Sequence, residues 1–194
     1  MKLPALAWQR EPAGPARRRS PFCRWKCCPH LPRHAHQVAD LDTHLRVTLF
    51  AVPVFVGFGA QGADRSTEYF RRTRRYIELN KGFCRSIMAG RPAVFHHTPH
   101  ILIYGRAERC VLEYGRRDRR RAYAGVFQLA DGSMAEGKPY VFCPRGLDMS
   151  LTYEVRLDND GSVFRASGRE LAAIGVPVRL DRPLTSELLL FDAV

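Results

Sequence analysis

Three histidines in the middle of the chain have the residue types and the spacing to do chemistry: His96, His97 and His100. Imidazole is a common zinc ligand and a general base near neutral pH. A metal site would need a further carboxylate or cysteine, and a general base would need a carboxylate to orient it. Cys84 with His97 would make a nucleophile pair. The group favours a small metal- or Cys/His-dependent hydrolase as one hypothesis; the alternative is a set of partly exposed histidines at a strand end.

A second group of metal-ligand types lies near the start of the chain, at Cys23, Cys27, Cys28 and His30. Thiolates and imidazoles suit zinc, but this spacing matches no standard zinc finger, in which a loop separates two ligand pairs. No set of apolar residues surrounds the group to build a small domain. We interpret it as a chance cluster, and the sequence predicts no cofactor.

The remaining cysteines are Cys84, Cys110 and Cys143. In an oxidising compartment two of them would form a disulfide and leave one over. Cys110 and Cys143 both fall in predicted strands, which makes them the candidate pair. The alternative is that all three are buried, unreactive thiols.

Arginines form two dense clusters. One cluster is a short segment between two predicted strands: Arg116, Arg117, Arg119, Arg120 and Arg121. Tyr114 and Tyr123 flank it, and their rings could stack on bases or sugars. The other cluster contains Arg71 and Arg75 on a predicted helix. Because guanidinium groups pair with phosphates and carboxylates, the clusters predict anion binding; the alternative is a solvated loop and a solvated helix face.

Two short motifs of the chain resemble, in part, those of the cyclic-di-GMP-binding PilZ family, which pairs Arg-x3-Arg with Asp-x-Ser-x-x-Gly on a small barrel. Here Arg71-x3-Arg75 is followed by Asp131-x-Ser133-x3-Gly137. The second element is one residue longer than the family's and lies far downstream. Because of these departures we base no prediction on the resemblance.

The composition is that of one globular domain with an extra segment. The chain has 194 residues, of which 45% are hydrophobic and 26% charged, and this argues against wholesale disorder. Its formal net charge is +12, carried mostly by arginine, as is typical of a GC-rich bacterial genome. A field this positive favours anionic partners such as nucleic acid, acidic polysaccharide or a membrane surface.

The first 63 residues differ from the rest. Residues 1–44 are rich in proline and arginine and show no lasting period, which predicts a disordered segment or one that is not translated. Residues 45–63 hold the apolar run Val47–Phe58, too short to span a membrane but typical of a signal-peptide core. This predicts a secreted or periplasmic mature chain without a transmembrane helix. The alternative is a buried strand in a cytoplasmic protein.

Residues 64–194 predict a single β-rich domain of the α+β class. One amphipathic helix follows Ser66 and Thr67 and ends near Asn80 or Gly82, and a second helical turn carries Phe83, Ile87 and Met88 up to Gly90. The alternative is a hairpin of Tyr76–Leu79 and Phe83–Met88. Strands separated by turn residues follow, in a mainly antiparallel sheet that is sandwich- or barrel-like. The predicted strands are Ala93–His97, His100–Tyr104, Arg109–Tyr114, Ala122–Leu129, Tyr140–Cys143, Ser150–Leu157, Ser162–Ala166, Val176–Leu180 and Glu187–Phe191.

The sequence lacks several motifs that are typical of enzymes: it has no phosphate-binding glycine loop, no Gly-x-Ser-x-Gly and no His-Glu-x-x-His. This leans against catalysis. We therefore predict a secreted or periplasmic bacterial domain with a binding or structural role, whose partner is an anionic polymer or another envelope protein. The alternatives are an Arg-rich nucleic-acid- or phosphate-binding protein and the hydrolase described above.

Overall fold

Along the central strands, apolar side chains point alternately to the two faces of the sheet, and both faces are buried. The structure, a computed structural model, describes residues 40–50, 66–98, 109–129 and 139–194. Its centre is a six-stranded sheet in the order β1-β2-β3-β8-β5-β6, in which every neighbouring pair is antiparallel. The strands are β1 (Ala93–His96), β2 (Arg109–Gly115), β3 (Arg121–Gln128), β8 (Ser186–Ala193), β5 (Thr152–Leu157) and β6 (Val163–Ser167).

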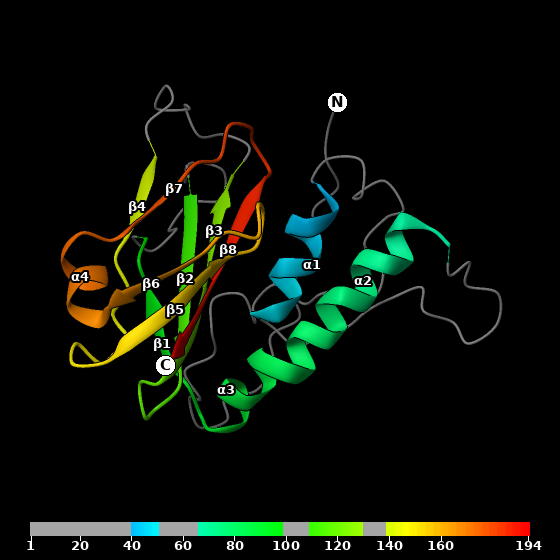
Figure 1. The fold of residues 1–194 in the computed structure, drawn as a ribbon. Helices are drawn as coiled ribbons and strands as arrows, with labels where there is room; N and C mark the ends of the chain where they lie inside the picture. Colours follow the sequence, from blue (N-terminus) through cyan, green and yellow to red (C-terminus); the bar gives the residue numbers. More distant parts are fainter. Residues whose placement is uncertain (1–39, 51–65, 99–108, 130–138) are drawn as a thin grey trace, which may run out of the picture.

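Helices cover one face of this sheet, and a smaller sheet covers the other (Figure 1). The helical layer consists of α1 (Leu41–Leu49), α2 (Glu68–Leu79), the π-helix η3 (Asn80–Cys84) and α3 (Arg85–Ala89). The opposite layer consists of β4 (Tyr140–Phe142) paired with β7 (Val176–Val178), and of α4 (Gly168–Ala173).

The helical layer begins where the sequence supplies caps. Asp40 caps α1 by accepting the N–H of Thr43, and Thr67 caps α2 by accepting the N–H of Phe70. The predicted helix end near Asn80 is confirmed, because α2 ends at Leu79 with Asn80 as its C-cap; helical backbone then continues through η3 into α3. A glycine ends a helix when it turns left-handed, and Gly82 does not have a positive φ.

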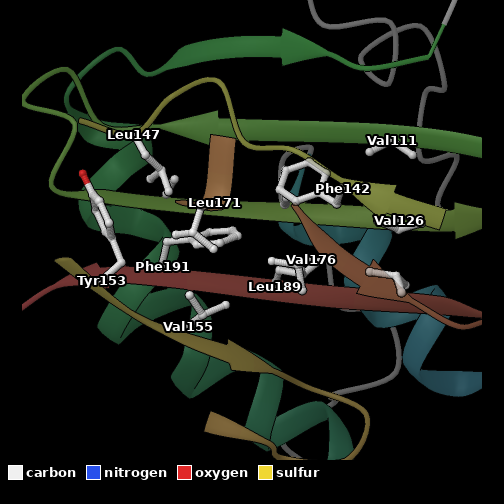
Figure 2. Packing of buried hydrophobic residues seen from close by; sticks show 13 residues of the cluster. Val111, Val126, Phe142, Leu147, Tyr153, Val155, Leu171, Val176, Leu189 and Phe191 are labelled. Carbon is white, nitrogen blue, oxygen red and sulfur yellow. The ribbon is translucent and has the colours of Figure 1, made fainter. Parts of the chain in front are cut away.

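Two buried clusters hold the layers together. On the helix side, Leu45, Leu49 and Phe50 of the α1 region pack with Leu112, Tyr123 and Leu188 of the sheet. On the other side, Figure 2 shows Phe142, Leu171 and Val176 packed against side chains of the central sheet. The sheet residues of that cluster include Val111, Val126, Tyr153, Val155, Leu189 and Phe191.

The predicted fold class, α+β with a mainly antiparallel sheet, is confirmed. Eight of the nine predicted strands match strands β1 to β8 within a few residues, and the ninth, His100–Tyr104, lies outside the described residues. Within the described residues, the helical side holds one helix more than the predicted helix and the turn that follows it. In particular, residues 41–49 form a helix within the core, although the sequence placed 1–44 in a disordered segment and 45–63 in a signal-like one.

Among the described residues, no helix has the length and apolar character needed to cross a membrane. The later part of the apolar run, from residue 51 to residue 58, lies outside them.

Candidate functional site

The histidine segment is divided between the two faces of the sheet. His96 pairs with Leu112 in the β1–β2 ladder and shares its helix-side face, whereas His97 lies on the opposite face. There His97 Nε2 is 2.8 Å from Glu113 Oε2, and the His97 ring lies 4.8 Å from that of Phe142. Glu113 is therefore the carboxylate that contacts His97, a partner that the sequence alone did not identify.

Glu113 connects three segments of the chain. Besides His97, its carboxylate accepts the backbone N–H groups of Arg145, at 2.9 Å, and Gly146, at 2.7 Å. The side chains of His97 and Glu113 are 5% and 0% exposed, so a substrate has no access to either. The pair ties the β1 end and the 145–146 loop to β2, which is a structural role.

Cys84 does not meet His97. Cys84 is buried in the helix-side cluster and His97 lies beyond the sheet, so the proposed nucleophile pair is not formed. Burial raises the pKa of the Cys84 thiol to about 12, which leaves it protonated and unreactive at neutral pH. His100 lies outside the described residues.

The three cysteines of the described chain are all free. Cys110 packs with the helix-side cluster, whereas Cys143 follows β4 in the opposite layer, so the sheet lies between the candidate disulfide partners. Burial also raises the pKa of Cys110, to about 11. Cys23, Cys27, Cys28 and His30 fall outside the described residues, within which no group of three His, Cys, Asp or Glu side chains could hold a metal.

The first arginine cluster forms the β2–β3 turn, and the structure divides its members. Arg121 is the first residue of β3 and binds Asp192 of β8 through two hydrogen bonds of 2.7 and 2.8 Å. Arg116 is 3.2 Å from Asp118, and Arg117 donates to the carbonyl of Arg91. The exposed members are Arg116, Arg117, Arg119 and Arg120, so the anion-binding surface predicted here has four arginines in place of five.

The second cluster contributes to a buried charged node at the end of the β5–β6 hairpin. Asp158 accepts hydrogen bonds from Arg46 Nη2 at 2.6 Å, from the Tyr76 hydroxyl at 2.7 Å and from Arg75. Arg46 is 1% exposed, and its Nη1 also donates to the carbonyl of Ser186 at 2.5 Å. Burial opposes the charge of Arg46, but Tyr76 and Asp158 outweigh it, so its pKa is raised. Arg75 is thus occupied by an internal partner.

Glu187 supports the same hairpin from the other side of β8. Its Oε1 accepts the backbone N–H groups of Asp158, Asn159 and Leu188 at 2.9, 3.0 and 2.9 Å. Burial raises the pKa of Glu187, although these N–H groups and Arg46 oppose the shift.

A groove of about 210 Å³ opens where the helical layer ends and the sheet continues uncovered. One wall comes from α2 and η3, with Glu78, Leu79, Gly82 and Phe83. The other comes from β5 and β8, with Glu154, Arg156, Leu190 and Asp192. The strand register explains the second wall, because Glu154 faces Asp192 and Arg156 faces Leu190 across the β5–β8 ladder.

Every carboxylate of the groove has a basic neighbour. Asp192 binds Arg121, Glu154 Oε1 is 3.4 Å from Arg156 Nη2, and Glu78 Oε1 is 3.6 Å from Lys81 Nζ. The Arg121 guanidinium also lies over the Phe83 ring, 5.4 Å from its centroid. These side chains are between a third and two thirds exposed, so their polar atoms face solvent at the groove.

Sequence reasoning missed this groove, although part of its signal was visible. The predicted strand Ser150–Leu157 already places Glu154 and Arg156 on one face. What the sequence did not reveal is that the helical layer stops short of that face.

No protein-family model matches the chain, and no curated protein matches it. Among solved structures, the chain is similar to the alpha-galactosidase from Lactobacillus brevis, with a TM-score of 0.56 and 17% identity over 80% of this chain. It is also similar to the galactosidase domain of the alpha-galactosidase–sucrose kinase AgaSK, with a TM-score of 0.52 and 16% identity over 66% of this chain. A third match is a variant of the GH36 alpha-galactosidase AgaA from Geobacillus stearothermophilus in complex with raffinose, with a TM-score of 0.50 and 18% identity over 66% of this chain.

The match covers 20% of the Lactobacillus brevis chain and 16% of each of the other two, so this chain spans about a fifth of its neighbours or less. At this level of identity the likeness shows a common fold.

Proposed function

We propose that this chain is a non-catalytic carbohydrate-binding domain of a protein that handles galactosides. The observation that carries the proposal is the fold shared with three alpha-galactosidase structures over 66% to 80% of this chain. Two of the four predicted catalytic candidates support a non-catalytic role, because the His97 side chain is 5% exposed and Cys84 is fully buried. Secretion stays a prediction, since residues 51–63 lie outside the described part of the chain.

Titration of the full chain with raffinose by isothermal calorimetry tests the proposal, with maltose as a control sugar that lacks a galactose unit. A parallel assay follows the hydrolysis of 4-nitrophenyl α-D-galactopyranoside. We expect saturable binding of raffinose, weaker binding of maltose, and hydrolysis no faster than in buffer. Absence of sugar binding, or hydrolysis that depends on the protein, would overturn the proposal.

A further inference from the structure

We infer that the groove between α2–η3 and β5–β8 is where the carbohydrate binds, and that it takes one uncharged hexose unit. This inference rests on the proposed function and names the site and the class of ligand. The groove is defined by its lining: Glu78, Leu79, Gly82, Phe83, Glu154, Arg156, Leu190 and Asp192.

The apolar part of the groove suits the carbon-bound face of a sugar ring. Leu79 and Phe83 come from the helical wall, and Leu190 lies beneath them on β8, only 5% exposed. A hexose presents C–H groups on one face and hydroxyl groups around its edge. Such a ring can pack its C–H groups on Phe83 and Leu79, which Leu190 supports from below, while its hydroxyls reach the polar rim.

The polar rim offers both acceptors and donors at fixed positions. The carboxylates of Glu154 and Asp192 accept hydrogen bonds, and the guanidinium of Arg156 donates them. Arg121 holds Asp192 through two hydrogen bonds, so this carboxylate is oriented before any ligand arrives. Since each sugar hydroxyl is both a donor and an acceptor, alternating carboxylate and guanidinium groups match a row of neighbouring hydroxyls.

The charge of the groove selects against anions. Its three carboxylates, from Glu78, Glu154 and Asp192, are balanced by the cations that contact them, Lys81, Arg156 and Arg121. A phosphate or uronate would gain no net attraction here and would be repelled by the carboxylates. The cations are also already engaged. An uncharged hexose has no such penalty, which distinguishes this groove from the exposed arginines of the β2–β3 turn.

The π-helix shapes the open side of the groove. A π-turn inserts an extra residue into a helix and often accompanies functional sites. Here it places Gly82 at the groove, and a Cβ added to Gly82 would meet no atom within 4 Å. A larger side chain at this position therefore enters open space at the rim of the groove, without displacing the core, and tests whether bulk at the rim hinders the sugar.

Gly82→Trp is the decisive variant, with Gly90→Trp as its matched control. Gly90 is also an exposed glycine at a helix end, it lies outside the groove lining, and a Cβ there makes only an ordinary contact. Raffinose and methyl α-D-galactopyranoside are titrated into the full-length wild type and both variants, after their melting temperatures are compared. We expect Gly82→Trp to weaken binding about tenfold or more, a loss of about 1.4 kcal/mol, and Gly90→Trp to change it less than about twofold.

Glu154→Gln gives a second reading that does not depend on added bulk. It removes an acceptor charge from a side chain that is a third exposed, so we expect the fold to persist and the affinity for raffinose to fall. Galacturonate is expected to bind more weakly than methyl α-D-galactopyranoside. If wild type binds raffinose and both Gly82→Trp and Glu154→Gln bind it equally well, the groove is the wrong site and the proposed function survives. If wild type binds no sugar, both fail.

Discussion

The buried node around Asp158 and the groove beside Asp192 are built from the same chemistry, carboxylates paired with arginines, but differ in solvation. At the node, Arg46 and Asp158 have side chains 1% and 4% exposed. At the groove, Arg121 and Asp192 have side chains 34% and 38% exposed. Removing one partner from a buried (dry) ion pair leaves an uncompensated buried charge. In a solvent-exposed (wet) ion pair, water replaces the lost partner. The difference predicts that the first pair holds the fold, whereas the second contributes little to stability and keeps an oriented carboxylate accessible to a ligand.

Arg46→Ala is expected to have the largest effect on stability. It leaves Asp158 without its buried guanidinium and opens space between α1 and the sheet. We expect the free energy of unfolding to fall by about 3–5 kcal/mol. Arg72→Ala on α2 is the control, because Arg72 pairs with Asp42 and Glu68 at a more exposed site and should cost about 1 kcal/mol or less. Urea unfolding measures both, and equal losses would remove the distinction between dry and wet pairs.

Glu113→Gln extends the comparison to the other face of the sheet. The amide keeps one acceptor oxygen but turns an NH₂ group toward the backbone N–H of Arg145 or Gly146. The expected cost is about 1–3 kcal/mol, the range for a buried group left unsatisfied. Hydrogen exchange should show faster opening of the 145–146 loop. Unchanged exchange there would mean that Glu113 does not hold the loop.

Glu187→Gln should change the pH dependence of stability. Burial raises the folded-state pKa of Glu187 above its ordinary value of 4.5. The folded state thus favours the protonated form of Glu187. The stability that this protonation contributes is fully present below pH 4.5 and is lost as the pH rises through the folded-state pKa of Glu187. The glutamine variant does not titrate, so the unfolding free energy of wild type minus that of the variant should decrease over this interval. Urea unfolding at several pH values checks the sign, and an increase would contradict it.

The exposed arginines of the β2–β3 turn should matter least for the fold. Replacing Arg116, Arg117, Arg119 and Arg120 by glutamine should change the unfolding free energy by less than about 0.5 kcal/mol per site. If this turn binds acidic polysaccharide or single-stranded DNA, the dependence of affinity on salt should become shallower in the variant. A wild-type chain that binds neither polymer at low salt would reduce this surface to a solvated turn.

Sequence reasoning located most of the fold because strand periodicity and turn residues are local signals. The β5–β6 hairpin illustrates this, since alternation fixed which face carries Glu154 and Arg156. Pairings between distant residues were not available in the same way. His97 meets Glu113 only through the register of β1 on β2, which no local pattern sets.

The buried node was missed for a different reason. Arg46 and Asp158 are 112 positions apart, and the apolar run after Arg46 resembled a signal peptide. That reading detached residues 45–63 from the domain, although Leu45 and Leu49 point into the core on one face of α1. Packing of a short amphipathic helix depends on the sheet it meets, so a segment considered alone does not disclose it.

The most direct test of the central contrast uses one isosteric change in each region, Asp158→Asn and Asp192→Asn, in the full-length chain. Unfolding free energy and raffinose affinity are measured for both. The account predicts that Asp158→Asn loses about 3–5 kcal/mol of stability and binds raffinose normally while folded, whereas Asp192→Asn loses about 1 kcal/mol or less and binds it poorly. Equal losses of stability, or unchanged raffinose binding by Asp192→Asn, would contradict it.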